Sequence, residues 1–127
     1  MSKERLLTES SFLVSETDEK GIISFANDDF CNYAGYTIDE LIGKPHNIVR
    51  NPDMPKEAFK QLWETIKSGK TWKGFVKNRS KNGDYYWVHA TIYPMTISNG
   101  EKGYMSCRRM ATKEEIKSAE LLYGTLN

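Results

Sequence analysis

Three segments in the second half of the chain, residues 71–77, 85–95 and 103–110, constrain the fold more than any other feature. Their side chains divide between two faces with the period of two residues that a strand imposes. Both connecting stretches contain Asn-Gly, the dipeptide that most strongly favours a tight hairpin turn. We therefore predict three consecutive antiparallel strands.

The first half of the chain begins with a predicted hairpin. Residues 12–15 and 22–26 read as strands, and residues 17–21 between them place Asp and Gly where a chain reversal favours them. Together with the three later strands, the hairpin predicts a five-stranded antiparallel sheet in an α+β fold, with short helices on one face.

Helix signals fill the remaining segments. Asn27 predicts one N-cap, and residues 37–40 form a capping box that opens a second short helix. The longest helix is expected to begin at Asp53 or the next residue, with Asp53 as its cap, and to end at Gly69. A last capping box at 112–115 opens a C-terminal helix. The apolar residues of this helix recur at coiled-coil-like spacing: Ile116, Ala119, Tyr123 and Leu126.

Composition excludes several classes of function. A chain of 127 residues suffices for one domain with a core, and its 18 basic and 17 acidic residues give no general attraction to nucleic acid or acidic lipid. The two cysteines, Cys31 and Cys107, lack the spacing of a metal site or a disulfide framework. The sequence shows neither a signal peptide nor an apolar run long enough to insert into a membrane, so we expect a cytoplasmic segment.

The segment 43–55, GKPHNIVRNPDMP, is a candidate binding loop. Its three prolines disfavour both helix and strand, and its polar side chains are denser than a connector requires. Binding residues concentrate on loops that a rigid scaffold positions. The polar residues of the loop are His46, Asn47, Arg50, Asn51 and Asp53.

Three stretches closely resemble the N-terminal PAS domain of bacterial aerotaxis (energy-taxis) receptors: FANDDFCNYAGYTIDELIGKPHNIVRNPDMP, WKGFVKNRSKNGDYYWVHATIYPM and GYMSCRRMATKEE. The resemblance extends from Val14 to Glu115. It implies a PAS sensor domain at 12–111, a lead-in at 1–11 and an output helix at 112–127. The family holds FAD non-covalently and reports its redox state to the chemotaxis machinery, so the resemblance implies a non-catalytic redox sensor.

The resemblance also implies the site residues. The FAD region of the family falls on Arg50, Asn51, Asp53 and Trp72, and Asn78 matches an asparagine that contacts the flavin edge in related domains. The family commonly has His where this sequence has Asn51, and Asn cannot become a cation near neutral pH. His46 is expected to order the loop.

Two alternatives stay open from the sequence. One is a haem-binding gas sensor that uses His46 as an axial ligand, and the other is a cofactor-free PAS module for interaction or dimerisation. By resemblance, the partner is a chemoreceptor signalling domain or a HAMP-type domain, in the same chain or a partner chain, and a homodimer is also open. Three side chains on the outer sheet face are candidates for partner contact: Trp87, His89 and Tyr93.

Overall fold

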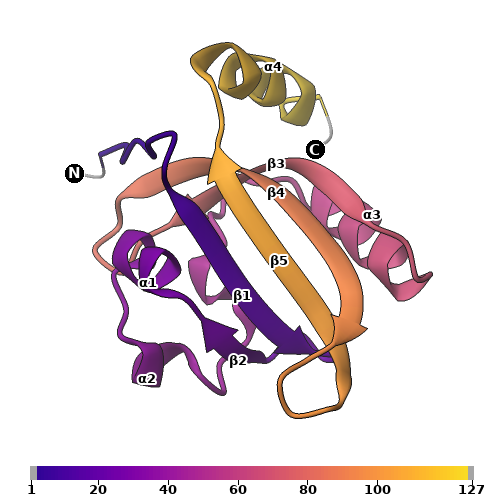
Figure 1. Cartoon of the computed structure of the whole chain (residues 1–127). Helices are drawn as coiled ribbons and strands as arrows, with labels where there is room; N and C mark the ends of the chain where they lie inside the picture. Colours follow the sequence, from indigo (N-terminus) through magenta and orange to yellow (C-terminus); the bar gives the residue numbers. More distant parts are fainter. Residues whose placement is uncertain (1–2, 126–127) are drawn as a thin grey trace.

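The computed structural model describes residues 3–125, which form a five-stranded antiparallel sheet in the order β2-β1-β5-β4-β3 (Figure 1). The α+β fold class with its five-stranded antiparallel sheet is confirmed. The strands are β1 (Phe12–Asp18), β2 (Ile23–Ala26), β3 (Trp72–Arg79), β4 (Tyr85–Thr96) and β5 (Lys102–Met110). The helices are α1 (Asp28–Ala34), α2 (Ile38–Leu41), the 3-10 helix η1 (His46–Val49), α3 (Lys56–Lys67) and α4 (Lys113–Tyr123).

The predicted alternation of the later strands matches the observed register. Asn78 of β3 pairs with Tyr86 of β4, and Ala90 of β4 pairs with Arg108 of β5, so these side chains share the inner face. Short helices α1 and α2 and the longer α3 cover this face with their apolar residues. The core they form with the sheet includes Leu13, Phe30, Leu41, Ile66 and Val88.

Strand β1 is longer than the sequence predicted. We expected a turn from Thr17, but pairing with β5 continues to Asp18, which lies opposite Gly103. The turn starts only there, because the Asp18 carboxylate accepts the amides of Lys20 and Ile22, each at 2.9 Å. A Cβ atom at Gly103 would lie 2.1 Å from the Thr17 carbonyl oxygen, so the close approach of the two strands requires glycine.

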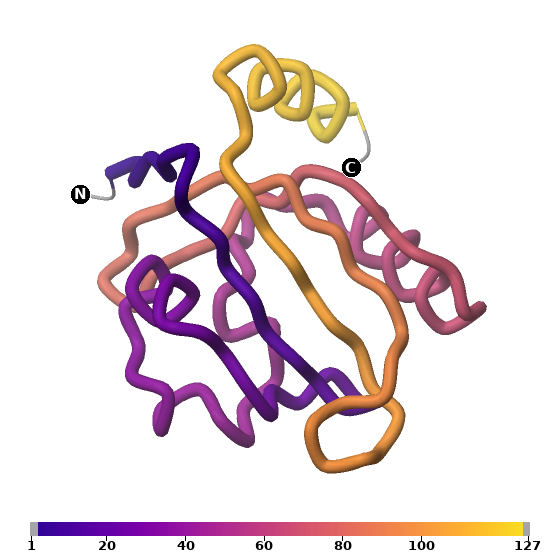
Figure 2. The backbone as a smooth tube through the Cα atoms, viewed as in Figure 1, coloured from indigo at the N-terminus to yellow at the C-terminus, as the bar shows by residue number. Residues whose placement is uncertain are grey.

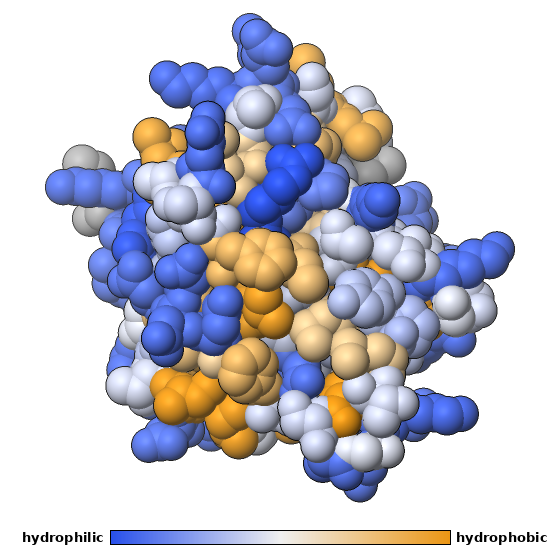
Figure 3. Space-filling model, viewed as in Figure 1, coloured by the Kyte–Doolittle hydropathy of each residue, from blue (hydrophilic) through white to orange (hydrophobic). Residues whose placement is uncertain are grey.

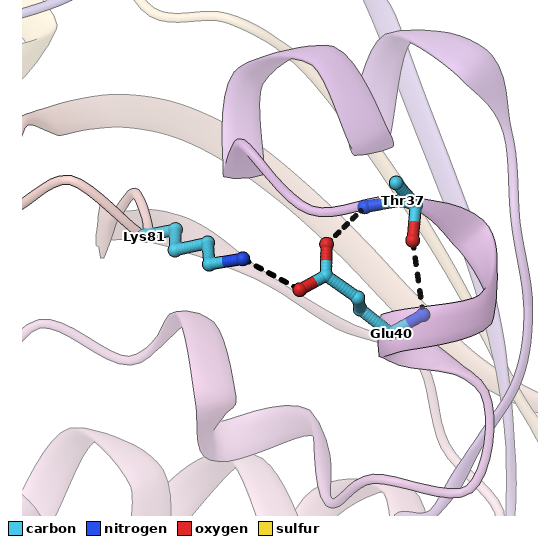
Figure 4. Close-up of polar contacts among 3 residues, drawn as sticks. All are labelled: Thr37, Glu40 and Lys81. Atoms are coloured by element: carbon cyan, nitrogen blue, oxygen red, sulfur yellow. Dashed lines mark hydrogen bonds and ion pairs between the residues drawn. The ribbon is translucent and has the colours of Figure 1, made fainter.

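Three predicted N-caps are confirmed. The Asn27 side chain accepts the amide of Phe30 at the start of α1. Thr37 and Glu40 satisfy each other's amides at the start of α2, and Lys81 from the β3–β4 turn pairs with the same Glu40 carboxylate at 2.6 Å (Figure 4). Thr112 and Glu115 form the equivalent capping box at the start of α4.

The predicted start of α3 is wrong. The helix begins at Lys56, its N-cap position is Pro55, and no side chain caps it. Asn51 causes the difference, because its side-chain oxygen accepts the Asp53 amide at 2.9 Å and extends the loop by a turn. The exposed Asp53 carboxylate pairs instead with Lys77 of β3, at 2.9 Å.

The C-terminal helix α4 packs on the outer face of the sheet. The Tyr123 ring stacks on the Trp87 ring with centroids 6.3 Å apart, and its hydroxyl donates to the Phe75 carbonyl. Trp87 is therefore buried rather than free for a partner, whereas His89 and Tyr93 are half-buried. The predicted heptad position Leu126 lies outside the described residues.

The rest of the outer face is partly apolar. Figure 3 shows orange side chains gathered over the open side of the sheet, between α4 and the β4–β5 loop. Phe12 and Phe25 are the large exposed apolar side chains of β1 and β2. Within residues 3–125, no helix combines the length and hydropathy that crossing a bilayer requires.

The lead-in is attached to the rest of the domain. Glu4 forms a parallel bridge with Tyr85, and the Arg5 guanidinium donates to the carbonyls of Asn32 and Tyr33 at 2.8 and 3.0 Å. The first and last described residues lie near the same end of the sheet (Figure 2). The division into lead-in, sensor domain and output helix stays a prediction.

Candidate functional site

A cavity of about 290 Å³ lies between the inner face of the sheet, the proline loop and α3. Its apolar walls come from η1, α3 and strands β3 and β4. Toward the sheet the lining is buried and polar, and toward solvent it is basic. The apolar lining residues are Val49, Phe59, Leu62, Trp63, Ile66, Val76 and Ile92.

The proline loop is fixed over the cavity at both ends. Pro45 bridges to Ile22 beside β2, and Arg50 bridges to Asn78 on β3. The His46 amide also donates to the Gly21 carbonyl at 2.9 Å. Because both anchors use backbone atoms, the side chains between them remain available to line the cavity.

His46 is held on the inner side of the loop. One ring nitrogen, Nε2, lies 2.9 Å from the Ser15 hydroxyl, and the ring meets the edge of Phe30 with centroids 5.5 Å apart. Burial, assisted by the positive charge of Arg108, lowers the pKa of His46 to about 3. The imidazole is therefore neutral at physiological pH.

The floor of the cavity contains an unusual buried cation. Arg108 on β5 is buried, and its Nε donates to Ser106 at 2.9 Å. Burial lowers the pKa of the guanidinium to about 10, so the side chain still carries its charge near neutral pH. Its Nη1 has no hydrogen-bond partner among the described residues.

Two further buried polar atoms lack partners in the described part of the chain. They are the side-chain nitrogen of Asn78 and the hydroxyl of Tyr86, which is opposite Asn78 in the β3–β4 register. Burial raises the pKa of Tyr86 to about 12, so it stays a neutral hydroxyl. An unsatisfied buried polar group destabilises a protein by about 1–3 kcal/mol. Asn78 and Arg108 both line the cavity, so their unpartnered atoms make it a candidate site for a polar ligand, whereas Tyr86 is outside the lining.

The residues predicted from sequence separate into two groups. His46, Arg50 and Asn78 all line the cavity. Asn51 is buried behind the loop, where it forms the turn before α3, and Asp53 points to solvent. Trp72 is on the inner face but outside the lining, with its ring over Gly74.

Sequence reasoning missed the buried polar pair Ser106 and Arg108. The period of two in residues 103–110 puts both on the face opposite Met105 and Cys107, and nothing in that pattern assigns them to a site. The signal was available: the other inner positions of that alternation are apolar or small, so an arginine among them is a charge directed into the core.

Comparisons with known proteins agree with this fold. The family model described as the PAS fold matches residues 23–108. By structure, the chain superposes on a light-oxygen-voltage domain studied with a flavin analogue, with a TM-score of 0.72 and 17% identity over 91% of this chain and 87% of that one. The dark structure of the Aureochrome1 light-oxygen-voltage domain superposes with a TM-score of 0.71 and 16% identity, over 90% of this chain and 84% of that one. The chain belongs to the PAS family.

Sequence comparison adds relatives of known role. The chain is 52% identical to the aerotaxis receptor of Escherichia coli over 121 residues, which are 95% of this chain and 24% of the receptor. It is 27% identical to a nitrogen fixation regulatory protein of Klebsiella pneumoniae over 105 residues, 82% of this chain and 21% of that protein. The chain thus spans about a quarter of the length of these relatives.

Proposed function

We propose that this protein is a non-catalytic sensor module that binds FAD non-covalently in the cavity and reports the flavin redox state to chemotaxis signalling. The observation that carries the proposal is that two residues of the cavity lining, Asn78 and Arg108, each have a buried side-chain nitrogen, Nδ2 and Nη1, without a partner among the described residues. A flavin ring has an edge of carbonyl oxygens and ring nitrogens, which a carboxamide and a guanidinium match. The 52% identity to an aerotaxis receptor supports the same assignment.

The cavity residues match the chemical parts of a flavin nucleotide, from the buried floor of the cavity outward to solvent. The apolar side chains of α3 and β3 would supply a slot for the ring, and Asn78 and Arg108 would hold its polar edge. Arg50 lies at the loop end with its guanidinium 4.0 Å from the Phe59 ring centroid, and its donors suit a phosphate group. FAD when bound supplies the redox change, in which electron uptake alters the charge and protonation of its ring.

The response to that change would begin at residues with fixed orientation. Arg108 already carries a buried positive charge, so its interaction with the ring depends on the charge of the ring. Asn78 is on the same strand as Phe75, whose carbonyl accepts from Tyr123 of α4. A shift of β3 at Asn78 would therefore alter the docking of α4. A switch of this kind requires a different interaction with each redox state.

The partner in this proposal is a chemoreceptor signalling domain or a HAMP-type domain, in the same chain or another. The Nε2 atom of His46 is engaged with Ser15, which argues against its use as a haem ligand. The buried unpartnered groups favour a ligand over a cofactor-free module.

Reconstitution with FAD tests the proposal. The purified protein is incubated with FAD and gel-filtered, and its visible spectrum is recorded. We expect the bands of oxidised flavin to elute with the protein, and to weaken in Asn78→Ala but not in the exposed control Asn32→Ala. A colourless protein that retains no flavin would refute the proposed function.

A further inference from the structure

The mouth of the cavity is lined by three cations from three different segments. Lys20 comes from the β1–β2 turn, Arg50 from the end of η1 and Lys60 from α3. Both lysines are exposed, whereas the floor around Arg108 is buried. Among the described residues that line the cavity, none is acidic.

The two lysines come from elements that meet at this mouth. Gly21 follows Lys20, and a Cβ atom there would lie 3.0 Å from the ring of Trp63. Trp63 follows Lys60 by three residues, about one helical turn. Because the turn and the helix are in contact at Gly21 and Trp63, the two lysines are on either side of a single opening.

Neither lysine is neutralised in the described part of the chain. The ion pairs found there involve Lys77, Lys81 and Arg109. The acidic neighbour Glu19 is exposed and forms no ion pair with Lys20 within the same residues. Uncompensated cations that surround an opening attract an anion, and phosphate oxygens are the acceptors that ammonium groups bind well.

We propose that Lys20 and Lys60 bind the phosphate groups of the flavin nucleotide, so that affinity depends on phosphate as well as on the ring. This inference rests on the proposed function. The cavity volume of about 290 Å³ lies just below the roughly 300–1,000 Å³ of most ligand pockets, so the cavity encloses only part of a dinucleotide. The enclosed space suits the ring portion, and the charged part of the nucleotide then lies at the mouth, between the lysines.

The test measures dissociation constants of the ligand-free protein for riboflavin, FMN and FAD by quenching of flavin fluorescence. Lys20→Gln and Lys60→Gln are each expected to weaken FAD binding roughly 2- to 5-fold, the range of exposed ion pairs, and the double variant roughly tenfold. Riboflavin binding should not change, because riboflavin has no phosphate. The matched control is Lys113→Gln, an exposed lysine on α4 outside the cavity lining.

Salt provides a second readout. The FAD dissociation constant of the wild type should rise more steeply with ionic strength than that of the double variant, because the variant has lost two screened contacts. If the lysine variants bind both FMN and FAD more weakly, the lysines contact the phosphate next to the ribityl chain. If they bind only FAD more weakly, the lysines contact the second phosphate. Either result supports the proposal.

Two results would overturn the inference while leaving flavin binding intact. One is an unchanged FAD dissociation constant in the double variant. The other is an equal weakening of riboflavin and FAD, which would mean that the lysines support the cavity rather than a phosphate. If the wild type binds none of the three flavins, the proposed function and this inference both fail.

Discussion

At the scale of single residues, Arg108 is a buried cation on the cavity lining with an unpartnered donor. Among residues 3–125, the buried Arg108 guanidinium donates only to Ser106, so it has lost its hydration and replaced few of those hydrogen bonds. Removing such a charge often leaves the fold as stable as before or more stable, whereas removing its partner does the opposite. In the proposed function, the bound ligand supplies the partner that Arg108 lacks.

We therefore expect Arg108→Met to separate stability from binding. The ligand-free variant should unfold in urea with an unchanged or larger free energy, by up to about 1–3 kcal/mol. FAD binding should weaken at least tenfold, as expected for a hydrogen bond to a charged group worth about 1.5–3 kcal/mol. The control is Arg109→Met, on the exposed outer face of the same strand. A destabilised variant with normal FAD affinity would contradict the role given to Arg108.

His46 predicts a dependence of stability on pH. Its pKa is about 3 in the folded protein and 6.5 as its ordinary value, so between these values the unfolded chain binds a proton that the folded chain does not. The contribution of neutral His46 to the free energy of unfolding is therefore complete above pH 6.5 and is lost as the pH falls toward 3. Each unit of pH below 6.5 lowers the free energy of unfolding by about 1.4 kcal/mol. At pH 5 the total loss is therefore about 2 kcal/mol.

Urea unfolding of the ligand-free protein at pH 7, 6 and 5 measures this slope. We expect His46→Gln to flatten it. Burial also lowers the pKa of His89, so His89→Gln should remove a further part of the slope in the same direction. The explanation fails if the free energy of unfolding of His46→Gln falls as steeply between pH 7 and pH 5 as that of the wild type.

At the scale of secondary-structure elements, local signals predicted most boundaries because they depend on neighbouring residues. The caps at Asn27, Thr37 and Thr112 are contacts over three residues, and each formed as expected. The predicted start of α3 was wrong because the Asn51 side chain accepts the Asp53 amide and keeps Asp53 in the loop. The sequence does not show whether Asn51 forms this turn or Asp53 caps the helix.

This difference predicts unequal effects of two substitutions. Thr37→Ala removes a true N-cap and should lower the free energy of unfolding by about 1 kcal/mol. Asp53→Ala removes only an exposed contact with Lys77 and should change it by less than ~1 kcal/mol. Both values come from urea denaturation. If Asp53→Ala proves the more destabilising of the two, Asp53 has a structural role that its exposed position does not explain.

Helix α4 gives a second prediction at this scale. Tyr123→Ala should remove both the stacking on Trp87 and the bond to Phe75, so α4 should lose hydrogen-exchange protection while the sheet keeps its own. Tyr123→Phe should have a smaller effect, and Leu121→Ala, at an exposed position of the same helix, should have none. Equal protection in Tyr123→Ala and the wild type would show that other contacts dock α4.

At the scale of the whole molecule, the strand alternation was enough to predict the sheet, because a period of two assigns each side chain to a face. The candidate site was harder, since it depends on which loop folds over which strand. The bridges from Pro45 to Ile22 and from Arg50 to Asn78 join residues distant in sequence. Sequence reasoning therefore found the loop and Asn78 but not Arg108, which lies on β5, the central strand of the sheet.

The arrangement also connects the cavity to the surface. The inner face of β3 holds Asn78 and its outer face contacts α4 through Phe75, so one strand joins the proposed flavin site to the C-terminal helix. This route needs no movement beyond a shift of β3. Such a shift would be compatible with a sheet whose five strands stay paired.

A crystal structure of the protein reconstituted with FAD tests the central claim most directly. We predict that the flavin ring occupies the cavity between the proline loop and α3, with its polar edge within hydrogen-bond distance of Asn78 and Arg108. A flavin bound elsewhere on the chain, or in the cavity but without contact to either residue, would contradict the account.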